Sequence, residues 1–315
     1  MAIDKKLIDQ FVNVTSKAAI ASSYFVGKKD KIAADKAAVD SMRFELNNLD
    51  IKGRIVIGEG ELDEAPMLYI GEKLGTKNGP EFDIAVDPLE GTNFAANNLP
   101  GALSVIAITE KDNLFKAPET YMEKISTKVQ EKNVVDLDYS VKKNIFNLSE
   151  YLNKKPENIT ACILERPRHN NIISELRDLK VKIKFISDGD VSGALLVTDE
   201  KYSVDIFLGT GGGPEGVLAA AALDVFNCSF QGRFLFKNDK DKKRAKEMGI
   251  KDLSKKYELN EIIKGDSIFC ATGITSGDLV SGIKIKEDKF ISETLVTHKY
   301  SGLKKVVKLN QKIIR

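Results

Sequence analysis

Residues 82–92 read FDIAVDPLEGT, and the interpretation of the whole chain starts from this stretch. The run Phe82–Val86 is mostly apolar or β-branched and stops at an Asp-Pro turn signal, which predicts a buried strand that ends at Asp87. A second acid, Glu90, follows three residues later, and Thr92 comes soon after it. Paired carboxylates at a strand end are ligands that hard divalent cations prefer, and a nearby hydroxyl can orient a metal-bound water. Taken alone, the stretch also fits a solvated surface turn.

The composition is that of an ordinary water-soluble globular protein. The chain has 315 residues, 42% of them hydrophobic and 30% charged, with 48 basic and 46 acidic side chains for a net charge of +2. This length favours two domains, and the balanced charge gives no basis for nucleic-acid binding. No apolar run approaches the roughly 18 residues of a membrane span, and the first residues lack the features of a signal peptide, so we expect a cytoplasmic protein with no membrane association.

The cysteines and histidines argue against disulfides and against a zinc site. Cys162, Cys228 and Cys270 lie far apart, each within an apolar run, which is typical of small core residues. His169 and His298 are the only histidines, too few for a histidine-rich metal site.

The periodicity of the chain predicts an α/β protein in two parts. The first part, residues 1–157, carries a metal-binding α+β lobe, and the second, residues 158–315, an α/β substrate-binding lobe. Expected helices cover residues 4–25, 29–48, a segment with Pro66 near its first turn, and 121–132, and expected strands include 53–57, 82–86 and 103–109. From residue 158, short apolar strands alternate with helices. The basic stretch 299–315 is expected to be an amphipathic last strand or tail.

A second group of acids lies in the turn IGEGELDEAP, residues 57–66. Glu59 sits between two glycines at a strand end, and Glu61, Asp63 and Glu64 follow within six residues. Crowded carboxylates repel one another unless a cation is present. An acidic first helical turn explains Asp63 and Glu64 equally well, but it does not explain Glu59.

Three further features have a structural interpretation, and two of them also have a functional one. Lys31 and Asp35, four residues apart, fit a surface ion pair on a helix. The segment ERPRH, 165–169, places two arginines after a strand, where they either bind phosphate or carboxylate oxygens or act as solubilising charges. The acids of SDGD, 187–190, either cap a helix or accept hydrogen bonds from sugar hydroxyls.

The glycine-rich loop GTGGGPEG, 209–216, matches GxGxxG but does not predict a dinucleotide site. Such a site needs an acid at the end of the next strand, and that strand ends without one. Glu215 also lies in the first helical turn, where a pyrophosphate would bind, and it fits better as a metal carboxylate.

Together these segments resemble class II fructose-1,6-bisphosphatase, a bacterial enzyme type in the lithium-sensitive, metal-dependent phosphatase superfamily. The resemblance runs in the family's order from about residue 20 to 225 and weakens beyond it. The matching segments are IGEGELDEAPMLYIGE, DIAVDPLEGTNFAANNLPGALSVIAI, APETYMEKI, ERPRH, ISDGDVSGAL and GTGGGPEGVLAAAAL.

The resemblance implies a layered α/β/α/β/α sugar-phosphatase fold, assembled as a homodimer or homotetramer, and a role for each matching residue. Mn²⁺ or Mg²⁺ would be held by Asp35 and Glu59 at one site and by Asp87, Glu90 and Glu215 at a second. Catalytic positions match Lys31, Glu61, Asp63 and Thr92. Substrate-binding positions match Gly91, Thr92, Tyr121, Arg166, Pro167, Arg168, Asp188, Gly189, Asp190 and Gly212.

The function expected from the sequence is therefore hydrolysis of the 1-phosphate of fructose 1,6-bisphosphate, a step of gluconeogenesis, to give fructose 6-phosphate and phosphate. The same chemistry on sedoheptulose 1,7-bisphosphate or an inositol phosphate is the nearest alternative. A non-catalytic sugar-phosphate or nucleotide-binding protein is the alternative from a different class, but plain binding does not require five acids around one phosphate.

Overall fold

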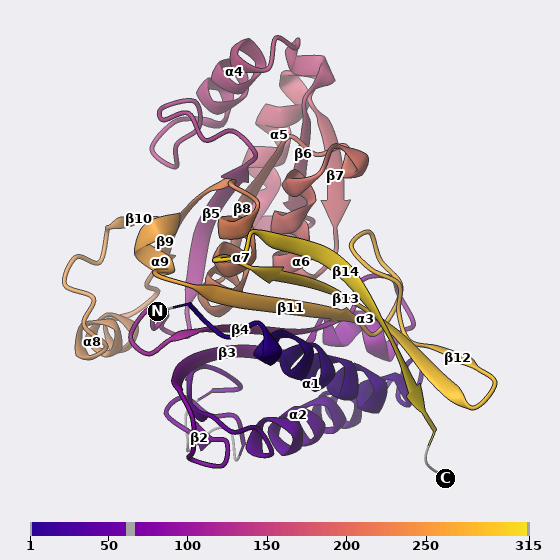
Figure 1. Cartoon of the computed structure of the whole chain (residues 1–315). Coiled ribbons are helices and arrows are strands. Elements are labelled where there is room, and N and C mark those ends of the chain that lie inside the picture. Colours follow the sequence, from indigo (N-terminus) through magenta and orange to yellow (C-terminus); the bar gives the residue numbers. More distant parts are fainter. Residues whose placement is uncertain (1, 61–66, 314–315) are drawn as a thin grey trace. The chain divides into compact units, whose positions relative to one another are not determined.

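The computed structural model of the chain describes residues 2–60 and 67–313 and contains two compact units (Figure 1). Unit 1 comprises Met1–Phe115 together with Ile263–Arg315, and unit 2 comprises Lys116–Ile262. This division differs from the boundary expected at residues 157 and 158. The chain enters unit 2 earlier, at the residues just before Tyr121, and its last part returns to unit 1, a long-range pairing that local composition does not reveal.

Unit 1 is built on a mixed sheet of eight strands among the described residues. Its order is β12-β13-β11-β4-β3-β1-β2, with β14 paired to β13. The parallel pair β1 and β3 lies beside antiparallel neighbours. The strand bounds are β1 Lys52–Ile57, β2 Lys73–Leu74, β3 Glu81–Glu90, β4 Leu103–Glu110, β11 Ser267–Gly273, β12 Lys284–Lys286, β13 Lys289–His298 and β14 Leu303–Lys312.

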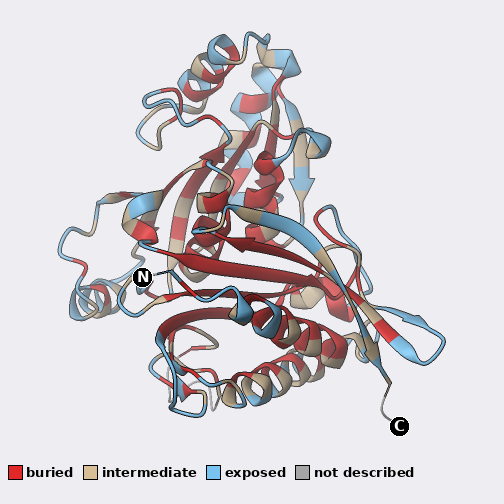
Figure 2. Cartoon of the chain, viewed as in Figure 1, coloured by how far each residue is buried: buried red, intermediate tan, exposed pale blue. Residues whose placement is uncertain are grey.

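Two long helices cover one face of this sheet. They are α1 (Lys6–Ser23) and α2 (Lys31–Asn47), and the short α3 (Thr92–Ala96) follows β3. Ile84 and Val86 alternate along β3 and join the core that α1 and α2 close. Figure 2 shows much of β3 and parts of both helices in the colour of buried residues.

Unit 2 is built on a second mixed sheet, with the order β10-β9-β5-β8-β6-β7. In its centre, β6 runs parallel to β7 and β8, and β5 runs antiparallel to β8 and β9. The bounds are β5 Tyr121–Thr127, β6 Thr160–Leu164, β7 Lys182–Ile186, β8 Ile206–Gly212, β9 Ser229–Leu235 and β10 Lys256–Glu258.

Helices cover both faces of the second sheet. On one face, α4 and α5 share a core with Ile125 and Leu208. On the other, α6 and α7 contact side chains that point the opposite way, such as Met122 and Phe207. The helix bounds of unit 2 are α4 Val141–Tyr151, α5 Asn170–Asp178, α6 Asp190–Leu195, α7 Gly213–Val225, α8 Asp239–Glu247 and α9 Leu259–Ile262. The helix–sheet layers of unit 1 and the helix–sheet–helix layers of unit 2 confirm the predicted layered α/β class.

Two expected helices are wrong. Residues 121–127 of the expected helix 121–132 form β5, the central strand of the second sheet. The described residues after Pro66 form a turn and β2, because Leu68 and Gly71 have φ angles of 54° and 96°, which a right-handed helix does not allow. The expected helices at 4–25 and 29–48 and the strands at 53–57, 82–86 and 103–109 are confirmed.

The cysteines behave as expected. Cys162, Cys228 and Cys270 are all buried, as expected for small core residues. None of the described helices combines the length and the apolar character needed to cross a membrane.

Candidate active site

The acids of unit 1 gather at one edge of its sheet because β1 and β3 are parallel. Lys52 pairs with Glu81 and Ile57 with Ala85, so both strands end at the same edge. Glu59 follows β1 there, and Asp87 and Glu90 close β3. Parallel strands thus bring acids that are about 30 residues apart in sequence to one place.

The end of β3 is irregular where the site residues lie. The pairing with β4 shifts register between Asp87 and Glu90, a bulge that changes the direction of the side chains. Gly91 then adopts a φ of 80°, and a Cβ there would lie 2.8 Å from the ring of Phe94. This glycine is therefore required by the backbone and lets the chain turn directly into α3.

Thr92 is the first residue of α3 and is not its cap, because Gly91 occupies the N-cap position without a side-chain bond. The Thr92 side chain is partly exposed, and among the described residues its hydroxyl makes no hydrogen bond. It is therefore available to a water or substrate, whereas Glu90, two residues earlier, is only 4% exposed.

The start of α2 is tied to α3 by backbone hydrogen bonds. The amides of Gly27 and Lys29 donate to the carbonyls of Ala95 and Ala96 over 2.9 and 2.8 Å. These bonds hold the N-terminal part of α2, which carries Lys31 and Asp35, beside the chain that follows β3.

Lys31 and Asp35 do not form the surface ion pair that their spacing permits. Among the described residues neither makes a salt bridge, and Lys31 is exposed. Asp35 is half-buried, and burial raises the pKa of its carboxyl group because it disfavours the charged form. A cation beside this carboxyl group would offset the cost of burying its charged form.

Glu59 is held by a tight packing of two backbone segments. Its amide donates to the carbonyl of Leu68 over 3.0 Å, and a Cβ on Gly58 would lie only 1.9 Å from that oxygen. Glycine is therefore required at position 58 because a side chain there would clash with the backbone of Leu68. Glu61, Asp63 and Glu64, which the sequence placed with Glu59, lie outside the described residues.

The substrate-binding candidates of unit 2 also meet at one sheet edge. Because β6, β7 and β8 are parallel, their carboxyl ends lie together, and each is followed by a candidate segment. Arg166 to Arg168 follow β6, Asp188 to Asp190 follow β7, and Gly212 ends β8. Tyr121 opens the antiparallel β5 and pairs directly with Gly212. In open α/β sheets, ligands bind at this edge.

Cationic side chains surround the ring of Tyr121. The guanidinium carbon of Arg168 lies 5.0 Å from the ring centroid, and the ammonium of Lys237 lies 4.3 Å from it. Arg168 also donates from Nε to the carbonyl of Thr210 over 2.9 Å. A third cation of this edge, Arg166, has a weak partner, because its guanidinium nitrogen lies 3.9 Å from a carboxylate oxygen of Asp188. This arrangement suits a phosphate, and Lys237 is a member that the sequence did not indicate.

Asp188, Gly189 and Asp190 form the turn between β7 and α6. Gly189 has a φ of 80° and occupies the N-cap position, so neither aspartate is the N-cap residue. Asp190 is 8% exposed and forms an ion pair with Lys124, which is 1% exposed. Lys124 was missed because its segment was expected to be a helix. In a strand, Met122 and Lys124 share one face, and a lysine on a buried face would have been the signal.

The glycine loop brings Glu215 against the end of β8. A Cβ on Gly212 would lie 1.8 Å from Oε2 of Glu215, so the loop backbone and this carboxylate are in direct contact. That oxygen is buried and has no hydrogen-bond partner among the described residues. Burial raises the pKa of Glu215, and the charge of Lys124 opposes this effect. Glu215 is thus a buried acid with an unused acceptor.

His169 was expected only as one of two histidines, yet it joins two segments of the site. The side chain is 1% exposed, its Nδ1 is 2.7 Å from the carbonyl of Leu164, and the amide of Thr210 donates to its Nε2 over 2.8 Å. These contacts require the neutral tautomer with the proton on Nδ1. Burial lowers the pKa of His169, and the charge of Arg168 lowers it further.

The donor set fits a hard divalent cation better than a soft one. All the candidate ligands are carboxylates, and two of them, Asp35 and Glu215, are acids whose charged form burial disfavours. The unpartnered Oε2 of Glu215 is an acceptor that a cation would satisfy. Within residues 2–60 and 67–313, however, no three acidic, histidine or cysteine side chains form a preassembled metal site.

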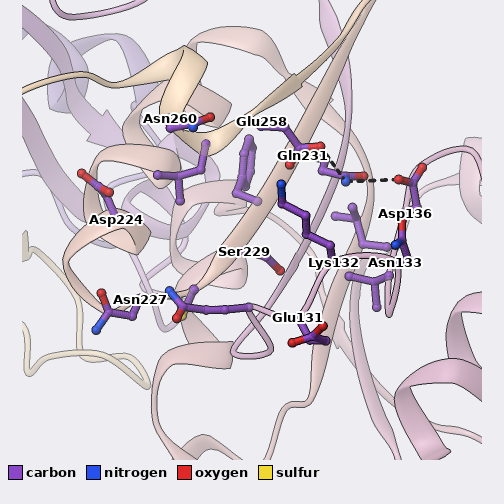
Figure 3. A pocket seen from close by; sticks show the side chains of 16 residues that line it. Glu131, Lys132, Asn133, Asp136, Asp224, Asn227, Ser229, Gln231, Glu258 and Asn260 are labelled. Carbon is purple, nitrogen blue, oxygen red and sulfur yellow. Dashed lines mark hydrogen bonds between the residues drawn. The ribbon is translucent and has the colours of Figure 1, made fainter. Parts of the chain in front are cut away.

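A separate cavity lies at the other end of the second sheet (Figure 3). It measures about 470 Å³, and Ser229 is one of its lining residues. Ser229 pairs with Thr127 at the end of β5 and β9 that lies opposite Tyr121. Its wall carries the acids Glu131, Asp136, Asp224 and Glu258 against a single lysine, Lys132. Such a wall repels a phosphorylated sugar, so we do not assign this cavity to the substrate.

Comparison with known proteins shows the family of the chain. Residues 5–311 match the model of the family described as bacterial fructose-1,6-bisphosphatase, glpX-encoded. The chain belongs to this family. Its members are metal-dependent sugar bisphosphatases.

Relatives of this family cover nearly the whole chain. A protein of Prochlorococcus marinus (strain MIT 9515), named D-fructose 1,6-bisphosphatase class 2/sedoheptulose 1,7-bisphosphatase, is 40% identical over 308 residues, which cover 93% of this chain and 92% of that protein. A protein of the same name from Synechococcus sp. (strain JA-3-3Ab) is 39% identical over 319 residues, with the same coverage.

Among solved structures, similarity is lower. The extragenic suppressor protein suhB of Bartonella henselae matches with a TM-score of 0.36 and 12% identity, covering 62% of this chain and 74% of that one. An inositol monophosphatase from Anabaena (Nostoc) sp. PCC 7120 matches with a TM-score of 0.32 and 13% identity, covering 62% and 71%. These similarities are too low to support a statement about function.

Proposed function

We propose that the chain hydrolyses the 1-phosphate of fructose 1,6-bisphosphate to fructose 6-phosphate and phosphate. The observation that carries the proposal is the edge of unit 2, where Arg168 and Lys237 flank the ring of Tyr121 and Arg166 lies near Asp188 of the β7–α6 turn. Cations suit a distal phosphate, and the acids suit sugar hydroxyls. Membership of the fructose-1,6-bisphosphatase family supports the same substrate.

The metal sites are assigned residue by residue. We propose that Asp35 and Glu59 hold one divalent cation, and that Asp87, Glu90 and Glu215 hold a second. The bound cations, Mn²⁺ or Mg²⁺, would offset the negative charge of the phosphoryl group and lower the pKa of the attacking water.

Side chains of this chain would do the remaining work. The partly exposed hydroxyl of Thr92, with Glu61 or Asp63, would orient the attacking water, and Lys31 would face the reacting phosphate as an exposed cation at the start of α2. Arg166 and Arg168, around Pro167, would bind the 6-phosphate with Tyr121. Asp188 and Asp190 would accept hydrogen bonds from the sugar, while Gly91, Gly189 and Gly212 would let the backbone approach it.

Sedoheptulose 1,7-bisphosphate is the second candidate substrate, since both cyanobacterial relatives carry this activity in their names. It presents the same two phosphates on a sugar one carbon longer. We also propose that the protein is cytoplasmic and forms a homodimer or homotetramer. Light scattering of the purified protein would test the oligomeric state.

The decisive experiment compares two variants on the same strand. Asp87→Asn at the carboxyl end of β3 removes a proposed metal ligand, whereas Glu81→Gln removes an exposed acid that pairs with Lys111 at the other end. Phosphate release is measured on a panel of sugar bisphosphates with Mn²⁺, with Mg²⁺ and with excess chelator. With either metal, it is expected to fall to background for Asp87→Asn and to stay normal for Glu81→Gln, and in excess chelator it is expected to fall to background for both. Full activity of the native chain in excess chelator would refute the metal assignment.

A further inference from the structure

The interior of unit 2 contains a lysine that no substrate or metal role explains. Lys124 lies in the centre of β5 and is 1% exposed. Lysine is almost never buried unless it is paired, because removing its charge from water is costly. The partners of its ammonium group therefore indicate the role of Lys124.

Two contacts hold the Lys124 ammonium group, and packing against α7 holds its stem. Nζ donates to the carbonyl of Gly212 over 2.6 Å and pairs with the carboxylate of Asp190. Its aliphatic stem passes the first turn of α7, where a Cβ on Gly216 would lie 3.3 Å from Cδ. The stem is therefore confined by the helix, and the charge is directed at the end of β8.

Asp190 is held from the other side by the glycine loop. A Cβ on Gly211 would lie 1.9 Å from Oδ2 of Asp190, so the carboxylate rests against bare backbone. Its second oxygen, Oδ1, is buried and has no hydrogen-bond partner among the described residues. One oxygen is thus committed to Lys124, and the other is left for a further donor.

We propose that Lys124 is a positioning residue for substrate binding, which holds Asp190 so that its free oxygen accepts a hydroxyl of the sugar. This inference rests on the proposed function, because it takes from it the role of Asp190. Lys124 touches neither the substrate nor the reacting phosphate. It acts through Asp190, and the carbonyl of Gly212 anchors it.

A double-mutant cycle tests this coupling. The variants are Lys124→Met, which keeps the stem and removes the charge, Asp190→Asn, and the two combined, each assayed for KM and kcat with fructose 1,6-bisphosphate and Mn²⁺. Losing a charge-assisted hydrogen bond in a binding site costs about 10- to 100-fold in affinity. We expect each single variant to raise KM by about this factor with a smaller change in kcat, and the double variant to match Asp190→Asn alone.

Lys256→Met is the matched control. Lys256 is a partly buried lysine of unit 2 that pairs with Asp136 and Asp138, away from the candidate site. Its loss is expected to lower the thermal midpoint and to leave KM unchanged, which separates lost stability from lost positioning.

Each outcome decides the question. If the effects of Lys124→Met and Asp190→Asn on KM multiply in the double variant, or if Lys124→Met leaves KM unchanged, Lys124 does not act through Asp190. If Asp190→Asn alone leaves KM unchanged, the proposed role of Asp190 fails first, and the inference fails with it. Should Lys124→Met not fold, the double variant, which buries a neutral pair, still compares directly with Asp190→Asn: equal KM values support the inference, and a further tenfold rise refutes it.

Discussion

His169 offers a sharp test of how the fold of unit 2 supports the edge that we propose binds phosphate. Its imidazole links the carbonyl of Leu164, at the end of β6, to the amide of Thr210 in β8. The carbonyl of the same Thr210 accepts the bond from Arg168. Replacing His169 with phenylalanine keeps an aromatic ring of similar size and removes both hydrogen bonds.

The expected loss follows from the groups left behind. A buried polar group without a partner costs about 1–3 kcal/mol. The Leu164 carbonyl keeps a second lone pair and Thr210 is only half-buried, so we place the total at about 2–4 kcal/mol of unfolding free energy. For a unit of this size, 1 kcal/mol moves the midpoint by about 2–4 °C, which predicts a fall of about 5–15 °C.

The effect on catalysis is expected to be selective. Because Arg168 is anchored on Thr210, His169→Phe is expected to raise KM several-fold and to change kcat less. Thermal melting and steady-state phosphate release on the same preparation measure both. His298→Phe is the control, since His298 is fully buried in unit 1 and bonds to Ser301 and Asp266 over 2.9 Å each. A lowered midpoint with unchanged KM for both variants would refute the link between His169 and Arg168.

Three further outcomes are expected. Arg168→Ala is expected to raise KM strongly with a smaller effect on kcat, whereas Arg177→Ala, which removes an arginine from the far end of α5, changes neither. Thr92→Ala is expected to lose about 10²–10⁴ in kcat, and Thr92→Ser, which retains the hydroxyl, to keep measurable activity; a normal kcat for Thr92→Ala would remove it from the mechanism. The pKa of His169 is lowered in the folded chain, so its contribution to stability is complete above the unfolded pKa of about 6.5 and is lost as the pH falls through the folded pKa. Between pH 7 and 5, the thermal midpoint of the native chain is therefore expected to fall more steeply than that of His169→Phe.

The sequence predicts local structure well where one period dominates. The run Phe82–Val86, which is buried throughout, forms part of β3 as expected, and the basic stretch 299–315 contains β14, whose residues alternate in exposure along much of its length. The helix predicted over residues 121–127 is wrong because Lys124 lies on the buried face of what is in fact a strand. With a charge there, the alternation is hidden, and the spacing of Met122 and Ile125 fits a helix equally well.

The domain division could not be predicted from local patterns. Strands β11 and β13 belong to unit 1 because β11 pairs with β4, which lies more than 150 residues earlier in the chain. Nothing in the composition near residue 263 marks this return. A boundary placed by a change in pattern near residue 158 therefore divides unit 2, whose central strand β5 comes before that point.

The residues of the candidate site also could be predicted only in part from local sequence patterns. The residues that we propose as ligands, such as Asp87 and Arg168, stand at strand ends in motifs that can be recognised in the sequence. The residues that we propose to hold them or their neighbours in place, Lys124 and His169, lie inside the unit, and their contacts depend on pairings between β5, β6 and β8. A buried lysine or histidine is costly unless its partners are already in position. Such residues are therefore visible only once the register of the sheet is known, and they are the places where substitution is expected to separate binding from stability.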